Sequence, residues 1–301
     1  MPIIGKHPSI ELDTVIFATD FSPASHNAGL YASAISAHFH TDLVVLHAFT
    51  LLQAALQVEV EKSKPSQQRI DLHHALSLTA EILQAGRGTT ESILLEGDPA
   101  KVVPKFSQHR RNSLLVLGTH GGGTIDRFVL GSTAEGILRH SNGPAITIGP
   151  RVNIVKAGAL SIKRILYATD CTSEAAHAAP VAVALADAFS AELDVLNVVS
   201  SSDIDHPEQL HQLQQHFYGA VEAAVPRHAE QICKPQTYVS VGQPHTEILK
   251  HIDEREIDLL ILGLRKNGQL GMQNMTAGTF RIIVEARCPV VTVASGSARH
   301  P

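Results

Sequence analysis

The sequence predicts an α/β protein built from two tandem doubly wound domains, each a parallel sheet with helices on both faces. Short apolar runs that favour strands alternate with helical patterns along the chain. These runs are apolar throughout, which is typical of strands that helices cover on both faces. The whole series occurs twice within 301 residues, a length that allows two domains with separate cores.

The first copy begins with a strand followed by a helix. Residues 14–19, TVIFAT, form a short β-rich run that Asp20 closes. Ser22 and Pro23 then supply an N-cap and a proline for the first helical position. We expect this helix to continue to about Phe39, because its apolar residues recur at helical spacing on one side.

The rest of the first copy continues the alternation. Residues 59–68 are polar and have little apolar periodicity, so a loop is expected before the second helix. The expected elements are a strand at 43–49, a loop at 59–68, a helix at 69–84, a strand at 91–97, a short helix capped by Asp98, and strands at 113–118 and 145–148.

Two loops of the first copy are expected to meet in one crevice. Ligands of open parallel sheets bind beyond the carboxyl ends of the strands, where Asp20 and Gly118 both lie. Gly131, Ser132 and Thr133 then open a helix, whose amides, hydroxyls and dipole favour an anion such as phosphate. A surface loop followed by an ordinary N-cap would explain the same residues without a ligand.

The second half repeats these segments in the same order. Residues 163–170, KRILYATD, restate DTVIFATD, and GDPAKVV returns as GQPHTEI. The fourth strand, SLLVLG, returns as DLLILG at residues 258–263. The stretch 150–162 has no counterpart, so we expect one domain at residues 1–152 and another at 161–301.

The two copies differ in the glycine-rich segment. Without a gap in the alignment, Lys266 stands where the first copy has Gly121, and Thr276 stands where it has Gly131. A side chain at a position of close backbone approach would obstruct a phosphate. We therefore expect that the second copy does not bind the same ligand in the same way.

Composition narrows the class of partner and the compartment. Apolar residues make up 44% of the chain, charged residues 18%, and the net charge is −5, which excludes a generally basic face for nucleic acid or anionic membrane. Cys171, Cys233 and Cys288 lie far apart without CxxC spacing, as expected in a reducing compartment. Neither a secretion signal nor an apolar run of about 18 residues is recognisable. We expect a cytoplasmic protein that binds neither nucleic acid nor membrane.

The spacing of the motif residues supports a family resemblance. Gly118 is followed after two residues by Gly121, and nine residues later by Gly131 and Ser132, with Asp20 after the first strand. The chain resembles a tandem universal stress protein over nearly its whole length, and the first copy resembles the nucleotide-binding subgroup. The resemblance implies a Rossmann-like fold of the adenine nucleotide alpha hydrolase type, with a five-stranded parallel sheet of order 3-2-1-4-5 in each domain.

The resemblance also implies the ligand and its contacts. ATP would bind to the first domain, with Mg²⁺ or Mn²⁺ carried by its phosphates. Adenine would lie against the end of the first strand and Ala48, and the phosphates on the glycine loop and the helix after it. For Asp20 a helix cap, and for Arg127 a solvated side chain, remain alternatives. The implied nucleotide-binding set is Thr19, Asp20, Phe21, Ser22, Ala48, Gly118, His120, Gly121, Gly122, Arg127, Gly131, Ser132 and Thr133.

These observations favour a nucleotide-dependent stress-response regulator over an enzyme. The Walker pattern GxxxxGK[ST] is absent from the sequence, and no carboxylate of the motif is placed to activate water. A slow ATPase or autophosphorylating enzyme with the same pocket, and a scaffold that binds no nucleotide, remain alternatives. The resemblance further implies that residues 145–148 pair with 290–293 within the chain, and a homodimer is left open.

Two smaller features have competing interpretations. The histidines near His73 and His211 invite a zinc site, but their spacing fits one helical face poorly, which favours solvated positions. Cys171 stands where a helix is expected to start, a place that can make a thiol reactive. A small buried residue in place of Phe21 is the favoured interpretation of Cys171.

Overall fold

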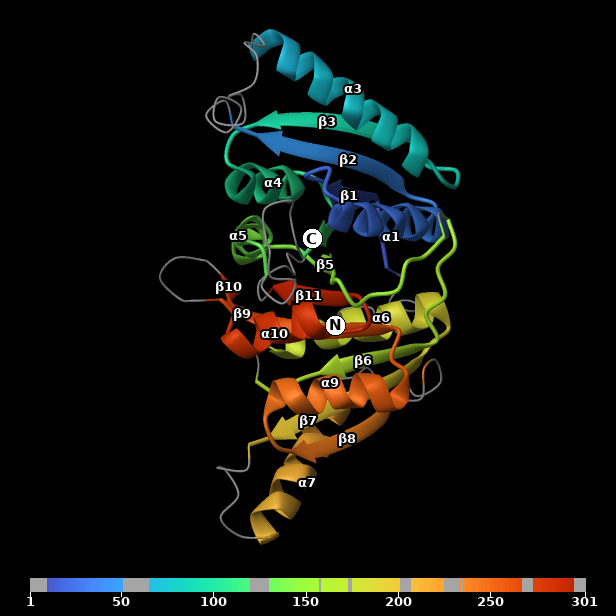
Figure 1. The fold of residues 1–301 in the computed structure, drawn as a ribbon. Coiled ribbons are helices and arrows are strands. Elements are labelled where there is room, and N and C mark those ends of the chain that lie inside the picture. The colour runs from blue at the N-terminus through green and yellow to red at the C-terminus, as the bar shows by residue number, and fades with distance from the viewer. Residues whose placement is uncertain are drawn as a thin grey trace, which may run out of the picture.

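The computed structural model describes the backbone of residues 10–50, 65–119, 130–156, 158–172, 175–200, 207–224, 233, 235–266 and 273–294. Helices lie on both faces of an elongated sheet, with α3 at one end of the molecule and α7 at the other (Figure 1). The first half contains β1 (Thr14–Ala18), α1 (Pro23–Phe39), β2 (Asp42–Phe49), α3 (Pro65–Leu83), β3 (Thr90–Glu96), α4 (Pro99–Gln108), β4 (Ser113–Gly118), α5 (Ser132–His140) and β5 (Ala145–Ile148).

The second half restates this series. Its elements are β6 (Arg164–Ala168), the 3-10 helix η1 (Ala175–Ala178), α6 (Ala179–Phe189), β7 (Glu192–Val199), α7 (Pro207–Ala224), β8 (Gln236–Val241), α9 (Pro244–Arg255), β9 (Leu259–Lys266), β10 (Gln273–Asn274), α10 (Ala277–Glu285) and β11 (Val290–Ala294).

The strand order confirms the predicted topology in both halves. Along the sheet the strands run β3-β2-β1-β4-β5-β11-β9-β6-β7-β8, which is the order 3-2-1-4-5 followed by its reverse. Within each half these neighbours are parallel, so the carboxyl ends of β1 and β4 lie side by side. Edge strand β10 pairs antiparallel with β9 outside this path.

The two halves join edge to edge through their last strands (Figure 1). Strands β5 and β11 are antiparallel, with Val290 opposite Thr147 and Thr292 opposite Ala145. Each threonine also donates its hydroxyl across the seam: Thr147 Oγ1 to Val290 O at 3.2 Å and Thr292 Oγ1 to Ala145 O at 3.3 Å. These are the segments for which a pairing is expected from the sequence.

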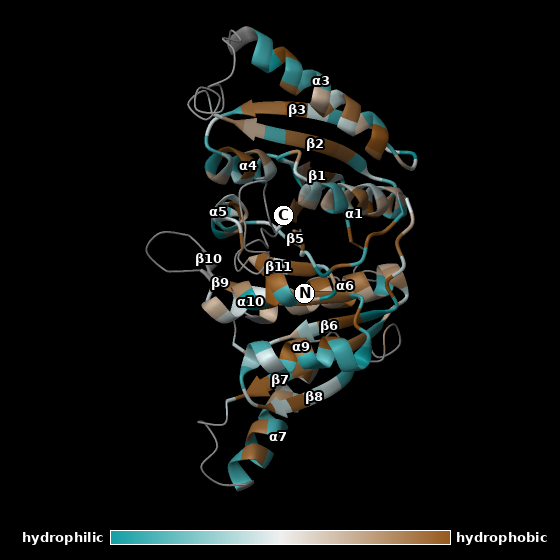
Figure 2. Cartoon of the chain, viewed as in Figure 1, coloured by the Kyte–Doolittle hydropathy of each residue, from teal (hydrophilic) through white to brown (hydrophobic). Residues whose placement is uncertain are grey.

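Alternation along each strand divides the core into two layers. In β1, Val15 and Phe17 face the layer that contains α1 and α6, while Ile16 faces the layer that contains α5 and α10. Both layers contain residues from both halves, so the apolar packing continues across the β5–β11 seam. Figure 2 shows the predominantly hydrophobic strands between helices that carry hydrophilic residues.

Most predicted elements are confirmed, and two boundaries are wrong. The second helix begins at Pro65, so residues 65–68 are helical rather than part of the expected loop. Proline at the first helical position is a start signal that outweighs the weak periodicity there. The strand expected at 258–263 extends to Lys266, because its last residues pair with β10.

A membrane-spanning helix is not found among the described residues, because none of their helices combines the required length and apolarity.

Candidate functional site

The turn after β1 is held by its own hydrogen bonds. Thr19 N–H donates to Leu46 O at 2.9 Å, which ties the end of β1 to β2. Asp20 Oδ1 accepts from the N–H of Ser22 at 3.0 Å, and Ser22 Oγ accepts from the N–H of Ser25 at 3.2 Å as the N-cap of α1. Phe21 completes the turn with a φ of 61°. Asp20 therefore shapes the turn before the helix, and the alternative that Asp20 itself caps the helix is wrong, because Ser22 is the N-cap of α1.

The second half builds the same turn. Cys171 has a φ of 60°, and Asp170 Oδ1 accepts from the N–H of Thr172 at 3.1 Å. Because this turn recurs beside a broken glycine motif, its geometry alone does not indicate a ligand. The prediction that a helix starts at Cys171 is wrong, because η1 begins at Ala175. Burial, with the nearby Asp170 carboxylate, raises the pKa of the Cys171 thiol to about 11, which opposes a reactive thiolate.

His47 is a feature of the crevice that was not singled out from the sequence. Its Nδ1 lies 2.7 Å from the carbonyl oxygen of Thr19, and its ring lies 4.6 Å from that of Phe21. Burial lowers the pKa of His47. In the second half Asn197 donates to the carbonyl of Thr169 at 2.9 Å from the same place. Both copies have a polar donor at this position of a strand that is largely apolar. This recurrence is the signal in the sequence that could have identified His47.

Gly118 packs closely against the start of α1. A Cβ at this position would lie 3.3 Å from both Ala24 O and Ser25 Cα, at the point where α1 begins. Its close backbone approach is therefore to the protein itself, in addition to any ligand. Ala48 lies half-buried near the end of β2, which is on the opposite side of β1 from β4.

We predict that Gly118→Ala lowers the free energy of unfolding by about 1 kcal/mol, because α1 must shift to admit the methyl group. Urea unfolding of the intact chain measures this loss. A stability equal to that of the wild type would show that α1 yields without cost. A loss of ligand binding by this variant must be compared with its loss of stability before it is attributed to a lost ligand contact.

The start of α5 has the geometry of an anion site. Gly131 is its N-cap, with φ −61° and ψ 139°, and has no side chain to cap the helix. The first-turn amides of Ser132, Thr133 and Ala134 have no acceptor within the helix. The side chains of Ser132 and Thr133 are exposed beside them. Gly131 N–H donates to Thr119 O at 2.8 Å, which fixes this end of the helix next to β4.

The corresponding helix in the second half caps itself. Thr276 is the N-cap of α10, and its Oγ1 accepts from the N–H of Thr279 at 3.2 Å. An acceptor of the protein therefore occupies a first-turn amide that α5 leaves open. The predicted alignment of Thr276 with Gly131 is confirmed, because both are N-caps of equivalent helices.

The described part of the predicted set clusters at one place. Strand β1 lies between β2 and β4. The residues that follow β1 therefore adjoin Ala48 on β2 and Gly118 on β4; they are Thr19, Asp20, Phe21 and Ser22. His120, Gly121, Gly122 and Arg127 lie outside the described residues. Among the residues that are described, no group of three or more His, Cys, Asp or Glu is arranged to hold a metal ion.

Comparison with known proteins gives a family match in both halves. The model of the universal stress protein family matches residues 11–148 and 161–294. Universal stress protein E of Escherichia coli K12 is 26% identical over 113 residues, which is 37% of this chain and 36% of that protein's length. A universal stress protein of Methanocaldococcus jannaschii is 27% identical over 141 residues, covering 44% of this chain and 80% of the relative.

A solved structure extends the likeness of fold to nearly the whole chain. The universal stress protein from Archaeoglobus fulgidus superposes with a TM-score of 0.68 at 18% sequence identity. The superposition covers 95% of this chain and 100% of that one. The tandem architecture is thus shared with a protein of known structure.

Proposed function

The chain belongs to the universal stress protein family as a tandem two-domain member, and from this premise we propose that it is an ATP-binding regulator of a stress response. Nucleotide binds in the first domain, residues 1–152, with Mg²⁺ or Mn²⁺ carried by the phosphates. The second domain, residues 161–301, has a different role. The protein acts in the cytoplasm, with its two domains paired within one chain.

The observation that carries this proposal is the uncapped start of α5 beside the β1 turn. Phosphate oxygens are suited to the free first-turn amides, and the helix dipole adds partial positive charge at the same place. The hydroxyls of Ser132 and Thr133 are exposed and available as further donors. The other predicted phosphate contacts belong to residues 120–129, which lie between β4 and this helix in the sequence.

Restriction to the first domain is supported by the contrast between α5 and α10. Thr276 supplies to α10 the acceptor that a phosphate would supply to α5. An anion that binds the Thr279 amide of α10 would have to displace this hydroxyl, whereas no side chain caps the equivalent amide at α5. Lys266 and Thr276 also replace Gly121 and Gly131 of the motif in the second copy, while Gly263 keeps the position of Gly118.

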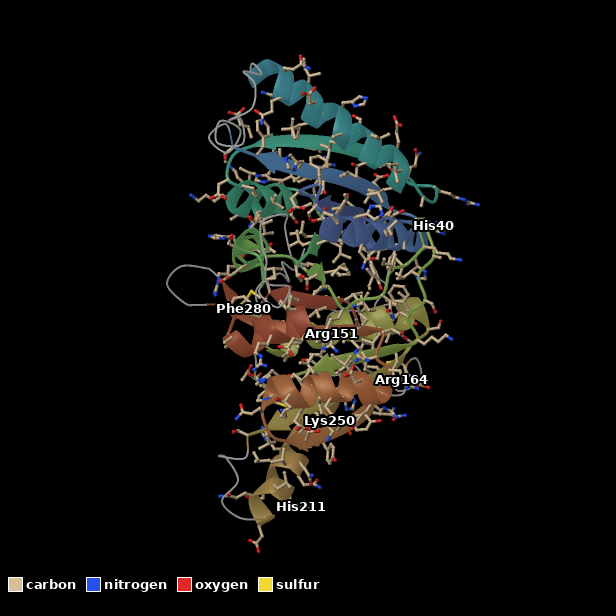
Figure 3. All side chains as sticks on the ribbon, viewed as in Figure 1. His40, Arg151, Arg164, His211, Lys250 and Phe280 are labelled. Carbon is tan, nitrogen blue, oxygen red and sulfur yellow. The ribbon has the colours of Figure 1, made fainter. Side chains whose placement is uncertain are left out.

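A path from the proposed site to the second domain suits a regulator. Glu135 in the first turn of α5 pairs with Arg139 at 2.8 Å. The Arg139 guanidinium carbon lies 5.1 Å from the ring centroid of Phe280, which Figure 3 labels where α10 meets the first half. A change in the first turn of α5 would therefore reach α10 through one side chain.

Calorimetric titration of the intact chain with Mg·ATP tests the proposal. We expect saturable binding of one nucleotide per chain. Asp20→Asn retains the Oδ1 that shapes the turn, so it separates loss of a ligand contact from loss of fold. We expect it to weaken ATP binding by about tenfold, the loss of one charge-assisted contact.

Asp170→Asn is the matched control, because Asp170 occupies the same turn in the second domain. We expect unchanged ATP affinity and stoichiometry for this variant. No binding by the wild type would reject the proposal, and a stoichiometry of two would reject its restriction to the first domain. Phosphate release above that of buffer, abolished by Asp20→Asn, would instead favour the ATPase alternative.

A further inference from the structure

A pocket lies in the second domain where the carboxyl ends of β6, β7 and β9 meet α9 and α10. Its volume is about 390 Å³, within the range of about 300–1,000 Å³ that small-molecule sites have. Leu196, Ile248 and Leu262 contribute apolar walls from three different elements. Val198 and Thr279 lie nearer the surface, where both are half-buried.

A coupled pair of substitutions distinguishes this region from the first domain. A Cβ on Gly136 would lie 2.7 Å from the Cβ of Ala100, so α4 and α5 cross closely there. The repeat places His245 at Ala100 and Arg281 at Gly136. These larger side chains meet through a 3.1 Å contact between Arg281 NH1 and His245 Nε2. Such a pair occupies the space between α9 and α10, at the side of the pocket that His245 lines.

The charges around the pocket disfavour an anion. Thr276 already caps the amide end of α10, and the exposed Asp170 carboxylate lies on the rim. Neither lysine nor arginine is among the described residues that line it. Arg281, a nearby cation within the described part of the chain, is paired with Glu285 at 3.2 Å. A phosphate at the start of α10 would therefore meet repulsion from the Asp170 carboxylate and competition from Thr276 Oγ1 for the amide of Thr279.

We propose that the second domain binds a small uncharged molecule with a largely apolar body and a hydroxyl or amine that donates to the Asp170 rim. Apolar walls provide the affinity through burial, and the carboxylate with the threonine hydroxyls fixes orientation. This site is independent of the nucleotide proposed for the first domain. The tandem chain then has two unlike ligand sites on one continuous sheet.

Two fluorescent dyes of the same shape test the chemistry. N-phenyl-1-naphthylamine is uncharged, and 8-anilinonaphthalene-1-sulfonate adds a sulfonate to the same aromatic body. Titration of the intact chain is expected to give saturable binding of one molecule of the amine per chain. Binding of the sulfonate is expected to be weaker by about tenfold or more. Equal affinity for both dyes, or no saturable binding of the amine, would overturn the proposal.

A matched pair of variants locates the dye. Ala48 and Val198 occupy equivalent half-buried positions of β2 and β7. Val198→Phe fills the pocket and is expected to weaken binding of the amine about tenfold, while Ala48→Phe leaves it unchanged. Thr279→Phe, on the rim of α10, is a second blocking variant if Val198→Phe unfolds. Undiminished binding by a folded blocking variant would refute the assignment, whatever ATP does in the first domain.

Thr276→Gly tests why anions are excluded. Removal of the hydroxyl gives α10 the uncapped start that α5 has. We expect the sulfonate dye to gain affinity about threefold to tenfold relative to the amine, because a first-turn amide becomes available. An unchanged ratio of the two affinities would contradict the role given to this cap.

Discussion

Gly131→Thr is expected to weaken binding of Mg·ATP about 10- to 100-fold, a loss of about 1.5–3 kcal/mol. The variant gives α5 the N-cap that α10 has, in which Thr276 Oγ1 accepts from the third amide of its helix. The same bond at α5 would occupy Ala134 N–H, one of the amides proposed for phosphate. Calorimetric titration with Mg·ATP measures the loss.

Stability provides the first control for this substitution. Gly131 has φ −61° and ψ 139°, a conformation that threonine adopts without strain. Glycine and threonine differ as N-caps by only a few tenths of a kcal/mol, so the free energy of unfolding should be nearly unchanged. A loss of binding in a chain of unchanged stability would then belong to the site.

Gly131→Ala separates the hydroxyl from the added carbon. Alanine brings a Cβ without an acceptor, so we expect ATP affinity to remain well above that of Gly131→Thr. Equal losses in the two variants would show that the position is limited by space, and the argument from capping would fail. Unchanged affinity in Gly131→Thr would remove α5 from the proposed phosphate site altogether.

The repeat in the sequence explains why the fold could be predicted so far. Apolar runs and helix start signals can be recognised within short stretches of sequence. Because these stretches recur in the second half, the repeat gave a second indication of where the elements lie. Pro23 and Pro65 both begin helices, yet the start at Pro65 was missed because the helix after it has little apolar periodicity. The extension of β9 to Lys266 could not be predicted, since it depends on pairing with β10, which comes later in the chain.

The candidate site was predicted less completely, because no short sequence pattern shows which part of the protein or ligand approaches a glycine closely. Glycine at position 118 suggested a ligand, whereas the structure adds the start of α1 as a close neighbour. The crossing of α1 over β4 is a tertiary contact that residue spacing does not encode. Asp20 was left with two interpretations, and the structure assigns the cap to Ser22, while Asp20 Oδ1 accepts from the N–H of Ser22 in the turn before the helix.

A buried ion network distinguishes the second domain from the first. Asp194 on β7 is 1% exposed, and its Oδ2 accepts from His251 Nε2 at 3.2 Å and from Arg255 Nε at 3.1 Å. Its Oδ1 has no hydrogen-bond partner among the described residues. The Arg255 guanidinium also lies 5.4 Å over the ring of Tyr238. Apolar residues Val44, Ile93 and Phe106 occupy the positions of Asp194, Tyr238 and His251 in the first domain.

Asp194→Ala is expected to lower the free energy of unfolding by about 2–4 kcal/mol. The substitution leaves the largely buried His251 and the one-third exposed Arg255 without their acceptor and opens a cavity in the layer beneath α9. Exposure of Arg255 to water moderates the cost relative to a fully buried pair. Urea unfolding at neutral pH measures the change, and a loss below about 0.5 kcal/mol would show that the network contributes little.

The double variant Asp194→Val, His251→Phe introduces the pair found in the first domain and should be near neutral or stabilising. It removes the buried charge together with its buried partner, and the partly exposed Arg255 keeps Gln236 Oε1 as an acceptor at 3.3 Å. The wild type and the double variant should differ in how much their free energy of unfolding falls in acid. Burial alone would raise the pKa of Asp194, but the hydrogen bonds and charges of His251 and Arg255 outweigh it and hold this pKa below its ordinary value. The Asp194 carboxylate therefore makes its full contribution to the free energy of unfolding above the ordinary aspartate pKa of about 3.9. This contribution is lost as the pH falls through the lower pKa of the folded state. The wild type should lose more stability than the double variant in that acid range, as followed by unfolding at each pH. Parallel losses in both chains would show that this carboxylate is not what acid disrupts.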